Sequence, residues 1–146
     1  VLDLNPEHND AKLNATQTCN EFGIKLHNDY EYNTALKYFK MVINLAPSEY
    51  FGYFNMGNTY FELKDFKNAK TYYKMALKFE PKHEHIQANL GEVYRNIGKI
   101  EKALGCYNKA IEINPENLLA NYNLANLLKR LGDHKNSEKF FKKREN

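Results

Sequence analysis

Apolar and small residues recur along the chain at intervals of three and four, which is the period of an α-helix. The clearest copy of the pattern, residues 50–83, predicts two helices whose packed faces consist of Tyr53, Met56, Gly57 and Tyr60 and of Ala69, Tyr73 and Ala76. Gly57 and Ala69 leave room for the two helices to approach, and Tyr73 fills the space beside them. Because proline cannot continue a helix interior, Pro81 marks the end of the second helix.

The same pattern returns every 34 residues, the spacing that separates Pro47, Pro81 and Pro115. The packed positions recur as Phe22, Gly23, Leu26, Ala35, Phe39 and Val42 in the preceding copy, and as Leu90, Gly91, Tyr94, Ala103, Tyr107 and Ala110 in the following one. A fourth copy has Leu124, Ala125, Leu128, Ser137 and Phe141 at these positions. Self-similarity at this period predicts a stacked array of hairpins rather than a single globular core.

We therefore expect helix pairs at 16–29 and 33–46, 50–63 and 67–80, 84–97 and 101–114, and 118–131 and 135–145. Breakers in the hairpin turns stand at Asn28-Asp29, Lys64-Asp65, Gly98 and Gly132-Asp133. From Pro6 to Pro47 the gap is 41 residues, seven more than the period. Seven residues make about two helical turns, so the first helix should start between His8 and Ala11, end at His27 and be two turns longer than its counterparts. Arg144 gives the last helix a polar face, which suits a terminal cap and is equally expected of a truncated array.

This order of aromatic, small and proline positions resembles the tetratricopeptide repeat, whose signature has the same residue types at the same spacings. The resemblance implies an all-α, right-handed superhelix of helical hairpins with three full repeats and most of a fourth. It divides a single domain, 1–146, into repeats 16–49, 50–83, 84–117 and 118–146, with 1–15 as the tail of a preceding repeat and a helix extension. It also implies that the first helix of each hairpin lines the concave side.

Composition and charge exclude several classes of protein. The net charge of +3 is mild, and we expect the lysines to be spread along the helices among glutamates rather than massed on one face, so we expect no nucleic-acid partner. No apolar run reaches 18 residues, so we expect no membrane span and no membrane partner. Cys19 and Cys106 form no CxxC pair, which favours a reducing compartment, cytoplasmic or nuclear. The start at Val1, without a charged and apolar leader, indicates a fragment or a processed form.

The sequence carries no pattern typical of catalysis. It has no phosphate-binding glycine loop, no HExxH and no cluster with metal-ligand spacing. We therefore expect a protein that is not an enzyme and needs neither cofactor nor metal. His83 and His85 stand on either side of a repeat boundary, where we expect them to face solvent.

Asparagines occupy one position of the first helices in three successive repeats, at Asn55, Asn89 and Asn123. Asn58 and Asn126 form a second row, which Glu92 interrupts. A side-chain amide offers two donors and one acceptor, so it can pair with both the N–H and the C=O of an extended peptide. The first repeat departs from the rows, because it has Glu21 and Ile24 at these positions.

These rows resemble the asparagine ladder in the superhelical repeats of O-GlcNAc transferase and the groove asparagines of kinesin light chains. The motifs NMGN (55–58) and NLAN (123–126) carry the likeness. It implies that extended segments of partner proteins bind in the concave groove. An alternative is that Asn is simply frequent at these positions, in a family where it is common and in a chain rich in Asn.

Larger side chains beside these rows are candidates for selectivity, namely Phe54, Tyr122, Arg95 and Arg130. Phe51, Phe54 and Phe61 exceed what the core face requires, so they either anchor a ligand or pack on the neighbouring repeat. Arg95 and Arg130 can bind a carboxylate with two parallel hydrogen bonds, which suits an acidic partner.

Three functions are open at this point. The chain is either a scaffold that binds partner peptides, or the substrate-presenting arm of a larger enzyme such as an O-GlcNAc transferase-like glycosyltransferase, or a structural subunit that self-associates through the ends of its array.

Overall fold

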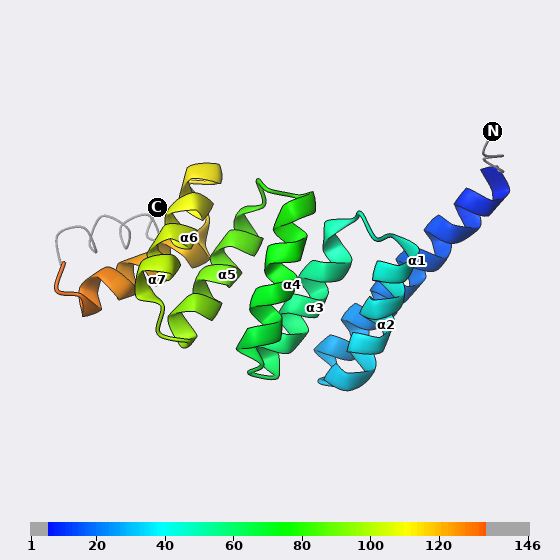
Figure 1. The fold of residues 1–146 in the computed structure, drawn as a ribbon, viewed down its shortest axis with the longest axis horizontal. Coiled ribbons are helices and arrows are strands. Elements are labelled where there is room, and N and C mark those ends of the chain that lie inside the picture. Colours follow the sequence, from blue (N-terminus) through cyan, green and yellow to red (C-terminus); the bar gives the residue numbers. More distant parts are fainter. Residues whose placement is uncertain (1–5, 134–146) are drawn as a thin grey trace.

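The computed structural model describes residues 6–133, and all regular structure in this range is α-helical. The helices are α1 (Pro6–Asn28), α2 (Tyr32–Leu45), α3 (Tyr50–Glu62), α4 (Phe66–Phe79), α5 (Glu84–Asn96), α6 (Ile100–Ile113) and α7 (Leu118–Arg130). They form three hairpins and the first helix of a fourth, stacked side by side in a row (Figure 1). The all-α class is confirmed, and the bounds of α2 to α7 agree with the expected ones to within one residue. The expected helix 135–145, with Arg144, lies outside the described residues.

Helix α1 is longer than predicted. It has 23 residues, against 13 in each of α3 and α5, so the excess is about three turns rather than two. The expected start near His8 to Ala11 was too late, because α1 already includes Pro6, the first residue that the structure describes. No helix in the described part of the chain is both long enough and apolar enough to cross a membrane.

The hairpin turns repeat a single backbone conformation. Tyr30, Lys64, Gly98 and Gly132, spaced 34 residues apart, have φ angles of 64°, 61°, 77° and 81°. At the end of α3 the Asp65 N–H donates to the Tyr60 carbonyl at 2.9 Å, and the Lys64 N–H donates to the Phe61 carbonyl at 2.9 Å. This pair of hydrogen bonds is the Schellman motif, which needs one residue with a left-handed backbone conformation after the helix. The sequence did not predict the left-handed conformation of Tyr30, because nothing in its side chain favours it.

Each hairpin is held by an aromatic ring that lies on a glycine. The rings of Phe39, Tyr73 and Tyr107, on α2, α4 and α6, lie against Gly23, Gly57 and Gly91 of the preceding helix. A Cβ built on Gly57 would lie 2.6 Å from Cδ1 of Tyr73, so any other residue would push the helices apart. The three rings and the alanines Ala35, Ala69 and Ala103 are buried, as the sequence predicts.

One expected core residue of the described chain is exposed, and it lies on α1. Phe22 is 46% exposed, whereas Met56, its equivalent one repeat later, is buried. Met56 lies on α3, which packs against α2 of the preceding hairpin. Among the described residues no hairpin precedes α1, and the ring of Phe22 packs on that of Tyr38 of its own hairpin, at a centroid distance of 5.0 Å.

The first helices form the inner face of the array. The backbones of successive first helices approach one another closely, in the pairs α1–α3, α3–α5 and α5–α7, whereas those of α2, α4 and α6 stay farther apart. Because the first helices are closer together than the second ones, the row of hairpins curves toward them. This arrangement is the one that the repeat pattern implied.

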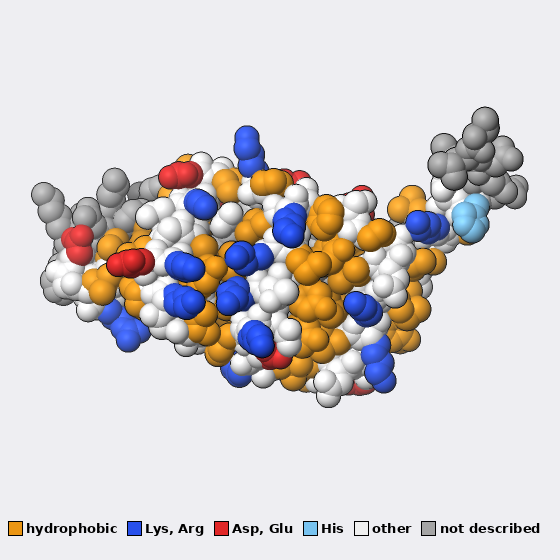
Figure 2. Space-filling model, viewed as in Figure 1, with side chains coloured by type: hydrophobic (Ala, Val, Ile, Leu, Met, Phe, Trp, Pro, Cys, Tyr) orange, Lys and Arg blue, Asp and Glu red, His pale blue; other side chains and the backbone are white. Residues whose placement is uncertain are grey.

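The two faces differ in charge. Helices α2, α4 and α6 carry eight lysines and two glutamates, whereas α1, α3, α5 and α7 together carry five basic and six acidic residues. Figure 2 shows lysine side chains gathered over α4 and α6, on the face that the second helices form. The expectation that lysines are not massed on one face was therefore wrong. Charges that alternate along the sequence, hairpin by hairpin, collect on opposite faces in space.

Candidate functional site

Three hollows follow one another along the inner face. The first, of about 250 Å³, lies between α1 and α3 and is lined by Ile24, His27, Asn28, Phe39, Asn55 and Asn58. The second, of about 360 Å³, is lined by His27, Asn58, Phe61, Glu62, Tyr73, Asn89, Glu92 and Leu119. The third, of about 240 Å³, lies between α5 and α7 and is lined by Arg95, Tyr122, Asn123, Asn126, Leu127 and Arg130. We call this inner face the groove.

The residues that the sequence analysis placed in the groove line these hollows, with two exceptions, Phe51 and Phe54. The ring of Phe51 lies 6.2 Å from that of Tyr50, measured between centroids. The ring of Phe54 lies between those of Tyr73 and His83, at centroid distances of 6.1 and 5.6 Å. Phe54 is half-buried and packs on the core, which is the second of the two roles considered for the surplus aromatics. Phe61, in contrast, lines the second hollow.

The asparagines of the groove bond to one another across the hairpin boundaries. Asn55 Nδ2 donates to Asn20 Oδ1 at 2.8 Å, and Asn89 Nδ2 donates to Asn58 Oδ1 at 3.1 Å. Asn20 is not part of the predicted asparagine rows, because it stands 35 residues before Asn55 and so falls outside the 34-residue period. Ile24 at the period position cannot accept a hydrogen bond, and Asn20, one turn earlier on α1, takes its place.

These bonds leave part of each amide available. An asparagine amide has two N–H groups and a carbonyl oxygen. Asn55 and Asn89 each use one N–H on the neighbouring repeat, and in residues 6–133 their carbonyl oxygens accept no hydrogen bond. Each therefore keeps one donor and one acceptor, which is what a peptide backbone requires.

Asn123 differs from the other two members of its row. It is only 8% exposed, and its Nδ2 is buried without an acceptor in the described structure. The residue of α5 that corresponds to Asn58 is Glu92, and its carboxylate is bound elsewhere. A buried donor without a partner is uncommon and costs about 1–3 kcal/mol.

Hydroxyl groups from the second helices reach the floor of the groove. Tyr73 donates to Asn58 Oδ1 at 2.7 Å, and Tyr107 donates to Glu92 Oε1. Burial raises the pKa of both hydroxyls, so both stay protonated and can donate.

The sequence held a signal for these contacts. Where the ring residue is Tyr73 or Tyr107, the facing groove residue is polar, Asn58 or Glu92, and where it is Phe39 the facing residue is Ile24. The ring residue and the groove residue thus change together from repeat to repeat.

Arg95 is already bound to a carboxylate. Its Nε and one terminal nitrogen donate to the two oxygens of Glu92, at 3.1 and 2.7 Å. The hydrogen bonds to Glu92 raise the pKa of Arg95 still further above its ordinary value. The two residues are three positions apart on α5, a spacing that allows such a pair. The guanidinium group of Arg95, which was expected to bind an acidic partner, is therefore already bound to Glu92. Arg130, in contrast, is exposed at the rim of the third hollow.

His27 stands between the first and second hollows and was also missed. Its Nδ1 lies 2.9 Å from Thr59 Oγ1, and the single hydroxyl proton of Thr59 is donated to the backbone carbonyl of Asn55 at 2.8 Å. Nδ1 must therefore be the donor, which leaves Nε2 as an acceptor in the neutral ring. Burial lowers the pKa of His27, and the nearby Glu62 carboxylate opposes this effect only in part.

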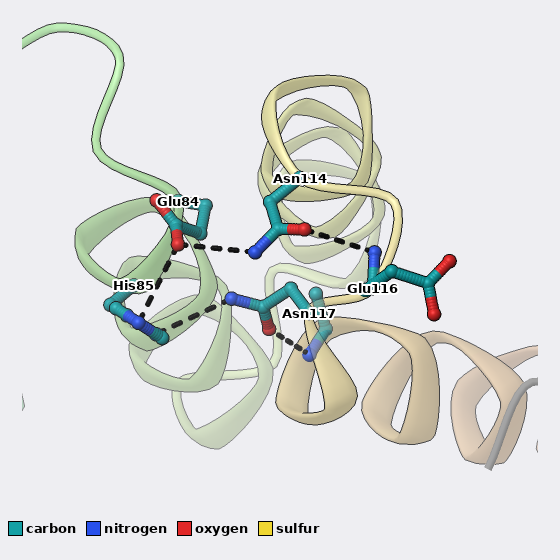
Figure 3. A network of polar contacts seen from close by, with 6 residues as sticks. Glu84, His85, Asn114, Glu116 and Asn117 are labelled. Carbon is teal, nitrogen blue, oxygen red and sulfur yellow. Dashed lines mark hydrogen bonds and ion pairs between the residues drawn. The ribbon is translucent and has the colours of Figure 1, made fainter.

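A polar network fixes α7 to α5 at one end of the groove (Figure 3). Asn117 accepts a hydrogen bond from the Ala120 N–H at 2.9 Å, so it caps the start of α7. Its Nδ2 lies 3.3 Å from Nδ1 of His85, and Glu84 accepts from Asn114 Nδ2 at 3.3 Å. The network joins the first turn of α5 to the turn between α6 and α7, so it fixes the starts of α5 and α7 relative to each other.

His83 was expected to face solvent but is half-buried. Its ring packs on Tyr50 and Phe54, at centroid distances of 4.9 and 5.6 Å, because the repeat boundary is closed by these aromatic side chains. His85 is exposed, as expected. In the described part of the chain no three His, Cys, Asp or Glu side chains are grouped as a metal site.

Comparison with known families and structures completes the description. The family model described as tetratricopeptide repeat matches residues 50–83, and the one described as TPR repeat matches residues 91–132. Together these matches cover just over half of the chain. No curated protein matches the sequence.

Solved structures share the fold. A crystal structure of MamA superposes with a TM-score of 0.80 at 22% identity, covering 94% of this chain and 81% of that one. MamA 41-end from Desulfovibrio magneticus RS-1 gives a TM-score of 0.77 at 24% identity, covering 88% of this chain and 72% of that one. At these identities the likeness concerns the fold alone.

Proposed function

The chain belongs to the tetratricopeptide repeat family, a family of protein-interaction scaffolds, and we propose that its groove binds an extended segment of a partner protein. The binding is non-covalent. The peptide backbone lies along the row of asparagines on α3, α5 and α7, and the three hollows receive side chains of the bound segment.

The proposal rests on one observation: side-chain amides that recur once per repeat each keep hydrogen-bonding groups that the protein does not use. Asn55 and Asn89 each keep one N–H and one carbonyl oxygen after bonding to the neighbouring hairpin. An extended peptide presents the complementary pair at every residue. The bonds to Asn20 and Asn58 hold the two amides in place before the ligand arrives, which lowers the entropic cost of binding.

The hollows differ, and selectivity follows from their linings. The second hollow combines the ring of Phe61 with the carboxylate of Glu62, so it suits a side chain with an apolar stem and a basic end. The third hollow combines Tyr122 and Arg130 with Arg95, whose charge Glu92 already balances. Recognition of an acidic side chain therefore rests on Arg130 rather than on Arg95.

A displayed library of linear peptides tests the proposal without a known partner. Peptides that bind the intact chain are selected, and their dissociation constants are measured for wild type, for Asn55→Ala/Asn89→Ala, and for the control Asn44→Ala/Asn108→Ala. The control removes exposed asparagines from α2 and α6. We expect about tenfold weaker binding or more for the groove variant, which corresponds to roughly 1.4 kcal/mol, and no change for the control. Equal affinities for all three proteins would refute the proposal.

Self-association through the end of the array is a second candidate, favoured by apolar side chains on α1. Leu13 and Phe22 are 65% and 46% exposed, and Phe22 occupies the position that packs on the preceding hairpin elsewhere. Sedimentation of wild type and Leu13→Glu/Phe22→Glu at rising concentration tests it. We expect the mass of the wild type to grow with concentration and that of the variant to stay monomeric. A wild type that stays monomeric throughout would exclude this candidate.

A further inference from the structure

We propose that the second hollow of the groove holds an arginine side chain of the bound segment, and that His27 makes this binding depend on pH. The inference rests on the proposed function, because it concerns one side chain of the peptide that the groove binds. The guanidinium group lies between the carboxylate of Glu62 on α3 and Nε2 of His27 on α1. Both residues line this hollow of about 360 Å³.

The second hollow carries negative charge that no basic residue of its lining balances. The lining contains two carboxylates, Glu62 and Glu92, and neither lysine nor arginine. Glu92 is bound to Arg95 at 2.7 Å, so its charge is already balanced from outside the hollow. Glu62, in contrast, forms no ion pair within residues 6–133. A ligand side chain with a positive charge therefore suits this hollow best.

The ring of His27 offers the hollow an acceptor. Its Nδ1 is the donor to Thr59 Oγ1, so Nε2 of the neutral ring accepts. Nε2 forms no hydrogen bond within residues 6–133 and is not one of the buried polar atoms that lack a partner, so a ligand can reach it. Oδ1 of Asn58, in the same lining, is already occupied, because it accepts from both Tyr73 and Asn89.

An arginine matches these two acceptors better than a lysine. Glu62 and His27 form no ion pair with each other, so a group that binds both has to span the gap between them. A guanidinium group spans two acceptors because its N–H donors point outward in one plane, whereas an ammonium group is a compact point charge. Phe61 from α3 and Leu119 from α7 line the same hollow and provide apolar contacts for the stem of the side chain.

This pair of residues sets the register of the bound segment. One period after His27 and Glu62 the chain has Phe61 and Asn96, so the pair is not repeated along the groove. The first and third hollows have no carboxylate in their linings, and the third contains the exposed Arg130. A segment with an arginine in the second hollow and an acidic residue in the third therefore lies in one direction only.

Protonation of His27 removes the acceptor. A protonated ring has an N–H on both nitrogens, and its positive charge repels a guanidinium group. The titratable groups that face the ring are Glu62 from α3 and Tyr32 from α2, whose ring lies 5.3 Å away between centroids and is neutral near pH 7.

Burial lowers the pKa of His27, and Glu62 opposes this effect only in part. The ring is therefore neutral at about pH 7.5 and gains its proton as the pH falls below about 6.5. Arginine keeps its charge over this range. Binding that is strong at neutral pH is thus weakened in acid by His27 rather than by the ligand.

Peptides selected on the intact chain from the displayed library, at about pH 7.5, supply the probe. We expect one position of these peptides to be enriched in arginine. A selected peptide without histidine is labelled with fluorescein, and a second version carries citrulline, the uncharged isostere, in place of arginine. Fluorescence anisotropy with the whole chain should show at least about tenfold weaker binding of the citrulline peptide.

A substitution at Glu62 locates the charge that the arginine requires. Glu62→Gln keeps the size of the side chain, so it should bring the affinities of the two peptides close together. Glu112→Gln makes the same change at an exposed position of α6, on the opposite face, and should leave the preference for arginine intact. Because Glu62 is also exposed, neither substitution disturbs the core. An undiminished preference for arginine in Glu62→Gln would overturn the proposal.

The pH arm tests His27. From about pH 7.5 to about pH 5.5 the wild type should lose affinity for the arginine peptide. His27→Asn keeps a donor toward Thr59 but has no acceptor at the place of Nε2. It should bind the arginine peptide more weakly than wild type at the higher pH and equally at both pH values. The same loss of affinity in wild type and in His27→Asn would refute the role of His27.

Failure of this inference differs from failure of the proposed function. Selected peptides that Asn55→Ala/Asn89→Ala binds weakly, but that have no preference for arginine at any position, would show that the groove binds peptides and would refute the arginine site. Selected peptides that the same double variant binds as tightly as wild type would refute both.

Discussion

Asn89 donates a hydrogen bond from Nδ2 to Oδ1 of Asn58, 3.1 Å away, across the boundary between two hairpins. The same oxygen accepts from the hydroxyl of Tyr73 at 2.7 Å. One amide oxygen thus joins α3, α4 and α5 at the floor of the groove. The groove is therefore a surface whose polar groups are fixed by the protein itself before any ligand binds.

This contact predicts that Asn58 contributes to stability as well as to the groove. Asn58→Ala removes the acceptor of both Tyr73 and Asn89, and partly buried donors without acceptors cost about 1–3 kcal/mol. Asn126→Ala is the matched control. Asn126 occupies the same position two repeats later, on α7, and makes no hydrogen bond within the described residues. Urea denaturation should show a loss in the free energy of unfolding for Asn58→Ala alone. Equal values for the two variants would contradict the shared-acceptor account.

The glycines under the aromatic rings predict opposite effects for the same substitution. Gly57→Ala would place a Cβ 2.6 Å from the ring of Tyr73, and such overpacking costs about 1–3 kcal/mol. Gly105→Ala meets open space within α6, so the better helix propensity of alanine should raise stability by about 0.5–1 kcal/mol. Thermal and urea unfolding measure both. A stable Gly57→Ala protein would show that the hairpin does not depend on this close approach.

The turn after α3 predicts a stabilising glycine. Lys64 has a φ of 61°, a region that costs a residue with a Cβ about 1–2 kcal/mol relative to its ordinary conformation. Lys64→Gly should raise the free energy of unfolding, in part offset by losing the contact of Nζ with the Phe61 ring at 5.4 Å. Lys64→Ala loses the same contact but keeps the strained backbone, so it is the control. The glycine variant should be the more stable of the two by about 1 kcal/mol. A tie between them would count against strain at this turn.

The position of His27 predicts a dependence of stability on pH. Burial lowers its pKa in the folded protein, so between the ordinary value of about 6.5 and the lower folded value the unfolded chain binds more protons. Stability from this residue is thus complete above about pH 6.5 and is lost as the pH falls. His27→Asn keeps a donor toward Thr59 but does not titrate. The fall in melting temperature from about pH 7.5 to about pH 5.5 should be smaller in His27→Asn than in wild type. The same fall in both proteins would contradict this reading of His27.

The sequence predicted the helices well because each repeat obeys local rules. Period-three and period-four spacing, the prolines and the glycine positions determine where helices lie and which faces pack. What it could not predict depends on packing between repeats. Phe22 has the pattern of a core residue, but its burial requires a hairpin in front of α1.

The sequence predicted where the groove lies, but not the hydrogen bonds between the side chains that line it. The asparagine rows lie on the inner face, but sequence spacing alone did not reveal that Asn55 would turn to Asn20 or that Glu92 would fill the fork of Arg95. Such pairs depend on side-chain directions across a helix boundary. The lysines of the second helices show the same limit, because their gathering on one face appears only once the hairpins are folded.

The central claim is that the groove holds the backbone of a bound peptide through the free half of its asparagine amides. The most direct test uses a peptide selected on this chain, N-methylated at one backbone amide at a time, with affinities measured for wild type and for Asn89→Ala. We predict at least one position where methylation weakens binding to wild type by about tenfold, roughly 1.4 kcal/mol, and leaves binding to Asn89→Ala unchanged. If no methylated position distinguishes the two proteins, the asparagine row does not bind the peptide backbone.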